Sequence, residues 1–467
     1  MDRSIGIDSI GVYVPRLYVD LTGQWATVRA PLFTGGDVAK LIGKVVDGVG
    51  VRRMAVVDAH QDCATLAAMA AKRAIDAAGI DPRDIDYLAV GTETTVDQSK
   101  SIAAYVLGML ERHYGVQLSD VGAPQFQFAC IGATYALEAA VSRIRAGDNT
   151  KPYSLVVASD ISSYPLGSAG EYTQGAGAVA LLLSEDPRVV VLERGLGATV
   201  TRDERDFFRP NDQRSAVVDG KYSIDVYLDC MEAAFEGYAV RFEGKVGARI
   251  DQLSDAIDFF CFHVPFPKMA EYASARVLGR IWHDDPRLRA LRVACETAGL
   301  SGDPGARKEF ERAFLRTPLF RAAFECKVAP SLSIARDVGN LYSGALFLAL
   351  VSLLERTRAL DLAGKRVLFG SYGSGASAKV FSGIIAARYR TLVDRLRVHE
   401  DLRPESEGGS RLELDVTQYE RLHAISDGER GASVRAPRQE FALERFGTSR
   451  TPERTDIGYR YYGWVGG

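Results

Sequence analysis

Along most of this chain, the spacing of apolar residues follows one of two periods. Runs with a period of two, or short continuous apolar runs, predict strands, and apolar residues three or four positions apart predict helices. In the first half, strands are predicted at 5–14, 86–93, 125–128, 154–160 and 175–183, and helices at 62–78, 99–114 and directly after Cys130. Strands that alternate with helices form a mostly parallel sheet covered on both faces.

The second half repeats this order. Its predicted elements are strands at 189–194, 258–263, 366–371 and 373–381, and helices at 226–241 and 341–356. Glu93 and His263 hold corresponding positions at strand ends, and Cys130 corresponds to Asn340, which opens the last helix. Ligands in open αβ sheets bind beyond the carboxyl ends of strands. We therefore expect an α/β fold of two duplicated halves whose strand ends share one pocket.

This repeat divides the chain into segments. We expect an N-terminal half at 1–187 and a C-terminal half at 188–400, with a charged helical insertion at about 283–327. Residues 401–467 are polar and end in an aromatic cluster at 459–464. We interpret them as a surface extension whose aromatic side chains dock on the body of the protein or on a partner subunit.

Composition narrows the class of protein. Of 467 residues, 47% are hydrophobic and 25% charged, and the net charge of −3 gives no general attraction to nucleic acid or anionic membrane. Six scattered cysteines indicate neither a disulfide framework nor a zinc knuckle. The start has no apolar signal core, and no apolar run is long enough to span a bilayer. These features predict a soluble, cytoplasmic protein.

Cys130 is the candidate nucleophile because it lies where a strand runs into a helix. The positive end of a helix dipole favours thiolate over thiol. A thiolate that accepts an acyl group needs an oxyanion hole, for which the Cys130 amide and Ser371, in the glycine-rich stretch 369–375, are candidate donors. The alternatives are a buried structural cysteine and a simple tight turn.

Glu93 and His263 are candidates for proton transfer and polarisation. Burial at a strand end would raise the pKa of Glu93 toward neutrality, which suits removal of a proton beside a thioester carbonyl. His263 leaves an apolar strand and could polarise a ketone oxygen. The alternatives are a helix-capping carboxylate and a structural histidine. Cys261 and His263 share a strand face but lack a third ligand, so we expect no metal site.

Two further residues have a chemical and a structural interpretation each. Lys268 follows the His263 loop and could hold the phosphates of a coenzyme A arm by its point charge, or it could be a solvated surface lysine. Asn340 opens a helix, so it is either an N-cap or an amide that orients a reacting thioester.

The motifs around these residues resemble those of hydroxymethylglutaryl-CoA synthases. They lie at 91–93 with 97–100, 129–134, 173–178, 262–265, 339–344 and 371–375, and the likeness runs from Ile5 to about Arg397. The resemblance implies a thiolase-like fold with a layered αβαβα core and a homodimer. It departs at 211–215, after the motif 207–210, and in the long segment beyond residue 402.

The resemblance also implies a reaction. Cys130 takes acetyl from acetyl-CoA, and Glu93 removes a methyl proton. The enolate attacks the ketone of acetoacetyl-CoA, whose oxygen His263 polarises, and water releases hydroxymethylglutaryl-CoA, as in the mevalonate route to isoprenoids. Coenzyme A thioesters are then substrates, and no cofactor is needed. Matching positions add binding or supporting residues: Lys268, Asn340, Ser343, Asp160, Thr173 and Asp206.

Three other functions remain open. A relative that condenses onto an acyl carrier protein, making β-branches in polyketide assembly, would use the same three residues, although no concentrated basic patch for carrier docking is evident. An initiating ketoacyl synthase would use Cys130, His263 and Asn340 without Glu93. A catalytically silent scaffold of this fold is the third.

Overall fold

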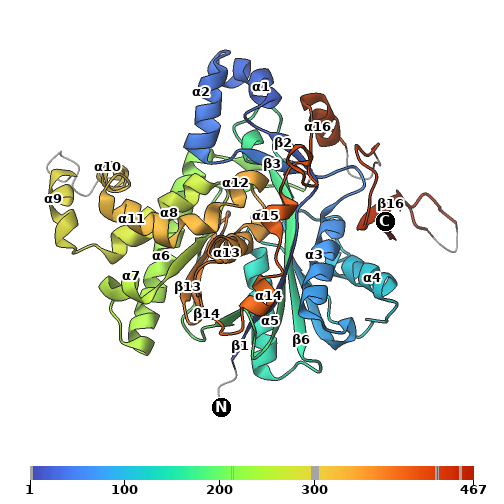
Figure 1. The fold of residues 1–467 in the computed structure, drawn as a ribbon, viewed down its shortest axis with the longest axis horizontal. Coiled ribbons are helices and arrows are strands. Elements are labelled where there is room, and N and C mark those ends of the chain that lie inside the picture. Colours follow the sequence, from blue (N-terminus) through green and yellow to red (C-terminus); the bar gives the residue numbers. More distant parts are fainter. Residues whose placement is uncertain are drawn as a thin grey trace.

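A mixed ten-stranded sheet forms the centre of the part of the chain that the computed structural model describes, namely residues 4–211, 213, 215–295, 304–425, 429, 431–451 and 455–466. Its order is β12-β13-β14-β8-β1-β7-β6-β4-β5, and β9 pairs with β14 (Figure 1). The strands are β1 (Ile5–Tyr13), β4 (Ile85–Gly91), β5 (Gln125–Phe126), β6 (Tyr153–Ser162), β7 (Gly175–Glu185), β8 (Val190–Leu192), β9 (Ala198–Thr201), β12 (Phe259–Phe262), β13 (Arg366–Gly373) and β14 (Ser377–Ile385).

The two halves of this sheet have the same order outward from the β1–β8 pair. On one side β7 is antiparallel to both β1 and β6, and β6 is parallel to β4. On the other side β14 is antiparallel to both β8 and β13, and β13 is parallel to β12. The duplicated α/β pattern predicted from the sequence is confirmed in this arrangement. The prediction of a mostly parallel sheet is wrong, because most strand pairs in the described part of this sheet are antiparallel.

Helices cover the sheet. They are α3 (Cys63–Ala78), α4 (Ile102–Tyr114), α5 (Gly132–Ala146), α6 (Gly220–Val246), α8 (Pro267–Ile281) and α13 (Ala345–Arg356). The alanine-rich helix α3 packs on β1, β6 and β7, and α6 packs on β13 and β14. The predicted start of α3 is confirmed, because the Asp62 side chain accepts hydrogen bonds from the Ala64 and Thr65 amides, and the helix ends at Gly79, which has φ 69°.

Two predicted helices begin later than expected. Before α4, the Asp97 carboxylate accepts hydrogen bonds from the Ser99 and Lys100 amides, so this segment is a turn and the helix starts at Ile102. Before α13, a 3-10 turn at Tyr342–Gly344 replaces the first helical residues. In both places local side-chain hydrogen bonds compete with the helix.

The segment between β1 and α3, to which we assigned no element from the sequence, forms a small separate layer. It consists of β2 (Leu17–Asp20), α1 (Gln24–Thr34), α2 (Val38–Gly43), a π-helical turn at Lys44–Val49 and β3 (Arg53–Val56). β15 (Leu412–Glu413) extends its sheet in the order β15-β2-β3, and α16 (Val416–His423) packs on α1.

The predicted insertion contains α9 (Pro286–Cys295), α10 (Pro304–Phe314) and α11 (Pro318–Lys327), while its residues 296–303 lie outside the described part. α10 and α11 pack on α8. Shorter elements are β10 (Phe207–Phe208), β11 (Val217–Val218), α7 (Leu253–Ala256), α12 (Ala335–Val338), α14 (Arg390–Val393) and α15 (Val398–Asp401). Across the described helices, none combines the length and apolar character needed to cross a membrane.

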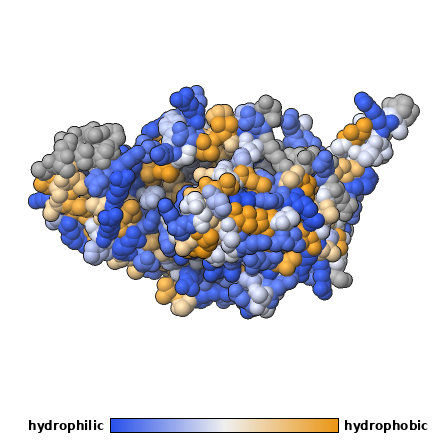
Figure 2. All heavy atoms as spheres, turned by 90° about the horizontal axis from the view of Figure 1, so that it is seen from above, coloured by the Kyte–Doolittle hydropathy of each residue, from blue (hydrophilic) through white to orange (hydrophobic). Residues whose placement is uncertain are grey.

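The chain ends in a hairpin of β16 (Glu440–Phe446) and β17 (Arg460–Val465), which lies against α3 and α4 of the same chain. Tyr105 of α4 contacts the rings of Tyr459 and Tyr462. Buried Glu440 accepts hydrogen bonds from the Tyr13 hydroxyl at 2.6 Å and the Gln61 side chain at 2.8 Å. Seen from above, a thin arm projects from one end of the molecule (Figure 2). The rest of this face is mostly hydrophilic and carries apolar patches between the polar residues.

Candidate active site

Glu93 lies two residues beyond β4, and the neighbouring strand β6 fixes its backbone. Oδ1 of Asp160 accepts hydrogen bonds from the Thr92 hydroxyl at 2.8 Å, the Glu93 amide at 2.9 Å and the Thr94 amide at 3.0 Å. The other carboxylate oxygen accepts hydrogen bonds from the amide and the hydroxyl of Ser343. Asp160 is fully buried, so it supports the site from beneath.

Cys130 lies between β5 and α5. The turn is tight: a Cβ on Gly132 would lie 2.8 Å from the Phe126 carbonyl oxygen, and Ala129 has φ 41°. The Cys130 thiol donates a hydrogen bond to Oε1 of Glu93 at 3.3 Å. The carboxyl ends of neighbouring strands thus place the Cys130 sulfur and the Glu93 carboxylate in contact, although the two residues are 37 positions apart in the sequence. The apolar cluster of Tyr164, Phe207 and Tyr342 packs beside the sulfur.

Burial shapes the proton affinities of this pair. Burial and the nearby Asp160 charge raise the pKa of Glu93 to about 8, against the opposing effect of Arg209. The predicted upward shift for Glu93 is therefore confirmed. Burial and the Glu93 carboxylate together raise the pKa of the Cys130 thiol well above its ordinary value. The prediction of a resting thiolate is wrong, because low polarity and a neighbouring negative charge outweigh the helix dipole.

His263 follows the last residue of β12. Its amide donates to the Gly370 carbonyl at 2.7 Å, and its carbonyl accepts from the Tyr227 hydroxyl at 3.0 Å. The imidazole lies near the Tyr227 and Tyr372 rings, with centroid distances of 6.3 and 6.5 Å. Burial lowers the pKa of His263 to about 3, so the ring is neutral at physiological pH.

The end of β13 connects His263 with the Cys130 turn. Ser371 and Thr134, in the first turn of α5, share a hydrogen bond of 2.7 Å between their hydroxyls. A Cβ on Gly373 would lie 2.7 Å from the Ile131 amide nitrogen, so the strand passes directly against the turn. Ser371 lies inside β13, which runs two residues beyond the end of the strand predicted at 366–371. Its hydroxyl supports α5.

Asn340 and Thr173 lie together near the cluster that holds Tyr342. The Asn340 amide donates to the Thr173 carbonyl at 3.1 Å, and its side-chain oxygen accepts from the Tyr342 amide at 2.8 Å. The Thr173 hydroxyl donates to the Gly170 carbonyl at 2.8 Å. The interpretation of Asn340 as an N-cap is wrong, because Leu341 is the N-cap of the 3-10 turn and Gly344 that of α13, and the Asn340 oxygen closes a local turn before them.

The side chains of Asp206 and Lys268 interact with other residues of the protein, Asp206 through hydrogen bonds and Lys268 through an ion pair. The Asp206 carboxylate accepts hydrogen bonds from the Tyr372 hydroxyl at 2.9 Å and the Gly375 amide at 2.9 Å, so it braces the ring beside His263. Lys268, at the start of α8, forms an ion pair of 2.7 Å with Glu271. Its side chain is partly exposed and does not line the pocket at Glu93.

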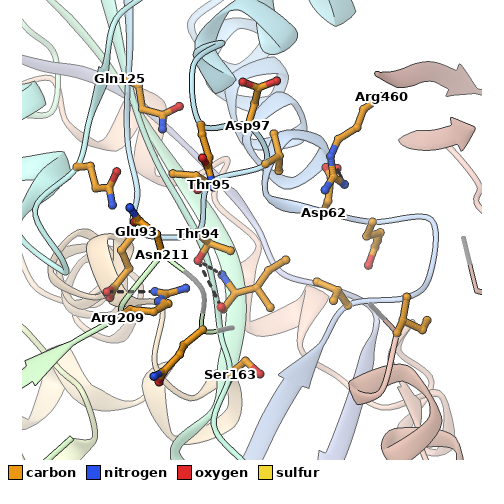
Figure 3. Close-up of a pocket in the computed structure, with 18 of the residues that line it drawn as sticks. Asp62, Glu93, Thr94, Thr95, Asp97, Gln125, Ser163, Arg209, Asn211 and Arg460 are labelled. Carbon is orange, nitrogen blue, oxygen red and sulfur yellow. Dashed lines mark hydrogen bonds and ion pairs between the residues drawn. The ribbon is translucent and has the colours of Figure 1, made fainter. Parts of the chain in front are cut away.

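A pocket of about 1020 Å³ opens beside Glu93 (Figure 3). Its wall includes Ala129, the neighbour of Cys130, and Leu443 and Phe446 from the C-terminal hairpin. Arg209, which the sequence analysis did not single out, points its guanidinium at Oε2 of Glu93 from 3.5 Å. The only available signal was its place in the motif 207–210.

Two family models together match most of the chain. Residues 1–187 match the model of the hydroxymethylglutaryl-coenzyme A synthase N-terminal part, and residues 190–412 match that of its C-terminal part. The chain belongs to the hydroxymethylglutaryl-CoA synthase family. This synthase family carries out an acyltransferase-type condensation, and the chain is such an enzyme.

Relatives along the whole chain support the assignment. The hydroxymethylglutaryl-CoA synthase of Haloferax volcanii is 32% identical over 458 residues, covering 95% of this chain and 97% of the relative. That of Enterococcus faecalis is 32% identical and covers 90% and 92%. The solved structure of MvaS in complex with 3-hydroxy-3-methylglutaryl coenzyme A has 33% identity and a TM-score of 0.81 over 100% of both chains. This likeness confirms the predicted thiolase-like synthase fold.

The HMG synthase of the curacin biosynthetic pathway, which has also been solved in complex with a donor ACP, shares the architecture. The curacin-pathway synthase has a TM-score of 0.74 and 23% identity, and it covers 99% of this chain and 100% of its own. At that identity the likeness extends to the fold alone.

Proposed function

We propose that this chain condenses acetyl-CoA with acetoacetyl-CoA to form hydroxymethylglutaryl-CoA, and that Cys130, Glu93 and His263 perform the chemistry. The observation that carries the assignment of residues is the 3.3 Å contact between the Cys130 sulfur and the Glu93 carboxylate, at strand ends of a synthase-family fold. A nucleophile beside a base with a pKa near neutrality is the arrangement that acyl transfer followed by proton abstraction requires.

In the first step Cys130 attacks the acetyl-CoA carbonyl. The sulfur–carbon bond of acetyl-Cys130 forms, and the bond to the coenzyme A sulfur breaks. The thiol proton ends on the departing coenzyme A thiolate, so coenzyme A leaves as its thiol. The positive end of the α5 helix dipole, beside Cys130, favours the carbonyl oxygen as it gains negative charge.

The second step begins from acetyl-Cys130. Because the acetylated sulfur carries no proton, Oε1 of Glu93 no longer accepts a hydrogen bond from it. The free carboxylate takes a proton from the acetyl methyl group, and the enolate carbon attacks the ketone of acetoacetyl-CoA. Neutral His263 donates a hydrogen bond to the ketone oxygen as that oxygen gains charge, and the proton that Glu93 took passes to this oxygen to form the product hydroxyl. Water then cleaves the thioester at Cys130 and releases the product.

Substitution of Glu93 separates these steps. We expect Glu93→Ala to retain acetylation of Cys130 by acetyl-CoA and to lose condensation with acetoacetyl-CoA by about a hundredfold or more. Acetylation is measured by mass spectrometry of the quenched enzyme, and condensation by the product formed. Glu309→Ala, on the exposed side of α10, is the control and should retain both reactions. Undiminished condensation by Glu93→Ala would overturn the role of Glu93.

We further propose coenzyme A as the carrier of the acceptor, a cytoplasmic homodimer and a place in the mevalonate route. Support for the carrier comes from the 33% identity over the full length to MvaS, which was solved in complex with 3-hydroxy-3-methylglutaryl coenzyme A. Acetoacetyl-CoA should be consumed faster than a carrier-bound acetoacetyl group. The opposite preference would favour the carrier-dependent alternative, and sedimentation measures the oligomeric state.

A further inference from the structure

The two oxygens of Glu93 face different partners. Oε1 accepts the hydrogen bond from the Cys130 thiol at 3.3 Å, and Oε2 lies 3.5 Å from the Arg209 guanidinium. The Glu93 side chain is 5% exposed and that of Arg209 is 27% exposed, so the pair is shielded on the carboxylate side and open toward the pocket. Figure 3 shows the guanidinium beside the carboxylate, with a dashed line between them.

Contacts of the residues just before Arg209 fix the position of its segment. Asp206, three residues earlier, accepts hydrogen bonds from the Tyr372 hydroxyl and the Gly375 amide. Phe207 pairs with Val218 in the short β10–β11 sheet. Arg209 is therefore held by buried contacts near its base, and its ordering costs less entropy than that of a free surface arginine.

The groups that face Glu93 from the surrounding elements are otherwise neutral or negative. Asp160 of β6 adds a negative charge that raises the pKa of Glu93. The Cys130 thiol and the phenols of Tyr164 and Tyr342 keep their protons, because burial raises the pKa of each. Among the residues that the structure describes, the guanidinium is the one cation paired with this carboxylate.

We propose that Arg209 is a positioning residue that increases the ionised fraction of Glu93 and turns its free oxygen toward the acetyl group on Cys130. This inference rests on the proposed function. In the step concerned, a methyl C–H bond breaks, its proton moves to Glu93 and its electrons become the enolate. A protonated Glu93 has no site for that proton, so the fraction of ionised Glu93 sets the rate at low pH.

The sign of the effect follows from the charges. A base works above its pKa, and the pKa of Glu93 is about 8 with Arg209 in place. An adjacent opposite charge lowers a carboxyl pKa by about one unit or more, so its removal should move the acid limb of condensation upward by about one pH unit. At pH 7 condensation should fall about tenfold, and it should recover at higher pH.

The test is single-turnover condensation over a range of pH. Enzyme is first acetylated with acetyl-CoA, freed of excess substrate and mixed with acetoacetyl-CoA. The wild type is compared with Arg209→Gln, which removes the charge, and with Arg209→Lys, which keeps it. Arg205→Gln removes the same charge from an exposed position on the same segment and should leave the acid limb in place.

The outcomes are distinct. An upward shift in Arg209→Gln, with Arg209→Lys and Arg205→Gln close to wild type, supports the inference. An unshifted limb in Arg209→Gln, whether or not the rate falls at every pH, overturns it, because a merely structural role lowers the rate without moving the limb. Acetylated wild-type enzyme that does not condense contradicts the proposed function instead. If Arg209→Gln does not fold, an acid limb in Arg209→Lys that moves upward by one unit also overturns the inference.

Discussion

Asp160 is the polar centre beneath the site, and its replacement by asparagine tests that role. Oδ1 accepts hydrogen bonds from the Thr92 hydroxyl, the Glu93 amide, and the amide and hydroxyl of Thr94. Oδ2 accepts from the amide and hydroxyl of Ser343. Every neighbour is a donor, so the asparagine NH2 group must face a donor wherever it is placed.

The least costly arrangement places the asparagine oxygen where the four donors converge and its NH2 group against Ser343. The Ser343 hydroxyl then rotates to accept, but the Ser343 amide loses its acceptor. A buried donor without an acceptor costs about 1–3 kcal/mol, and loss of the charged acceptor weakens the remaining bonds by about 1 kcal/mol more. We expect Asp160→Asn to lower the free energy of unfolding by about 3 kcal/mol.

Urea denaturation at neutral pH measures this change. Asp186→Asn is the control, because the Asp186 side chain is 89% exposed and its substitution should change stability by less than about 0.5 kcal/mol. Asp160→Asn should also lower the pKa of Glu93, since the Asp160 charge raises it, and should move the acid limb of condensation to lower pH. A stability loss below about 1 kcal/mol, or an upward shift of the limb, would refute the reasoning.

Three other variants or titrations probe separate parts of the structure. His263 should stay neutral in the folded protein down to pH 5, because burial lowers its pKa to about 3, and imidazole protonation near pH 6.5 in an NMR titration would contradict this. Gly373→Ala would bring a Cβ within 2.7 Å of the Ile131 amide nitrogen, so acetylation of Cys130 should slow by about tenfold or more, and a wild-type burst of acetylation would exclude that clash. Glu440→Gln should cost about 2 kcal/mol in urea denaturation, because the Tyr13 hydroxyl and its neighbours lose a charged acceptor, whereas unchanged stability would show that the hairpin is held elsewhere.

Local sequence signals predicted the elements well where neighbouring residues decide them. The start of α3 follows from Asp62 and Thr65, three residues apart, and its end follows from Gly79. The approach of Glu93 to Cys130 followed from strand ends alone, since parallel strands present their carboxyl ends on one edge. These features require no knowledge of side-chain packing.

Features set by distant partners could not be predicted. Arg209 meets Glu93 across 116 residues of sequence, from a segment with no hydrophobic period. Glu440 accepts a hydrogen bond from the Tyr13 hydroxyl, 427 residues earlier in the sequence. Because its partners are so distant, the role of the extension at 401–467 could not be predicted. The expectation that the Cys130 thiolate is favoured was wrong. A helix dipole can be predicted from sequence, whereas burial and the adjacent Glu93 carboxylate, which raise the pKa of the thiol, are seen only in the fold.

Mapping the acetyl group on the quenched enzyme shows whether Cys130 is the nucleophile. The wild type is mixed with acetyl-CoA alone, stopped with acid, digested and analysed by peptide mass spectrometry. The account predicts a single acetyl group on Cys130 that disappears when acetoacetyl-CoA is added before the acid. An acetyl group on another residue, or one on Cys130 that acetoacetyl-CoA does not discharge, would contradict it.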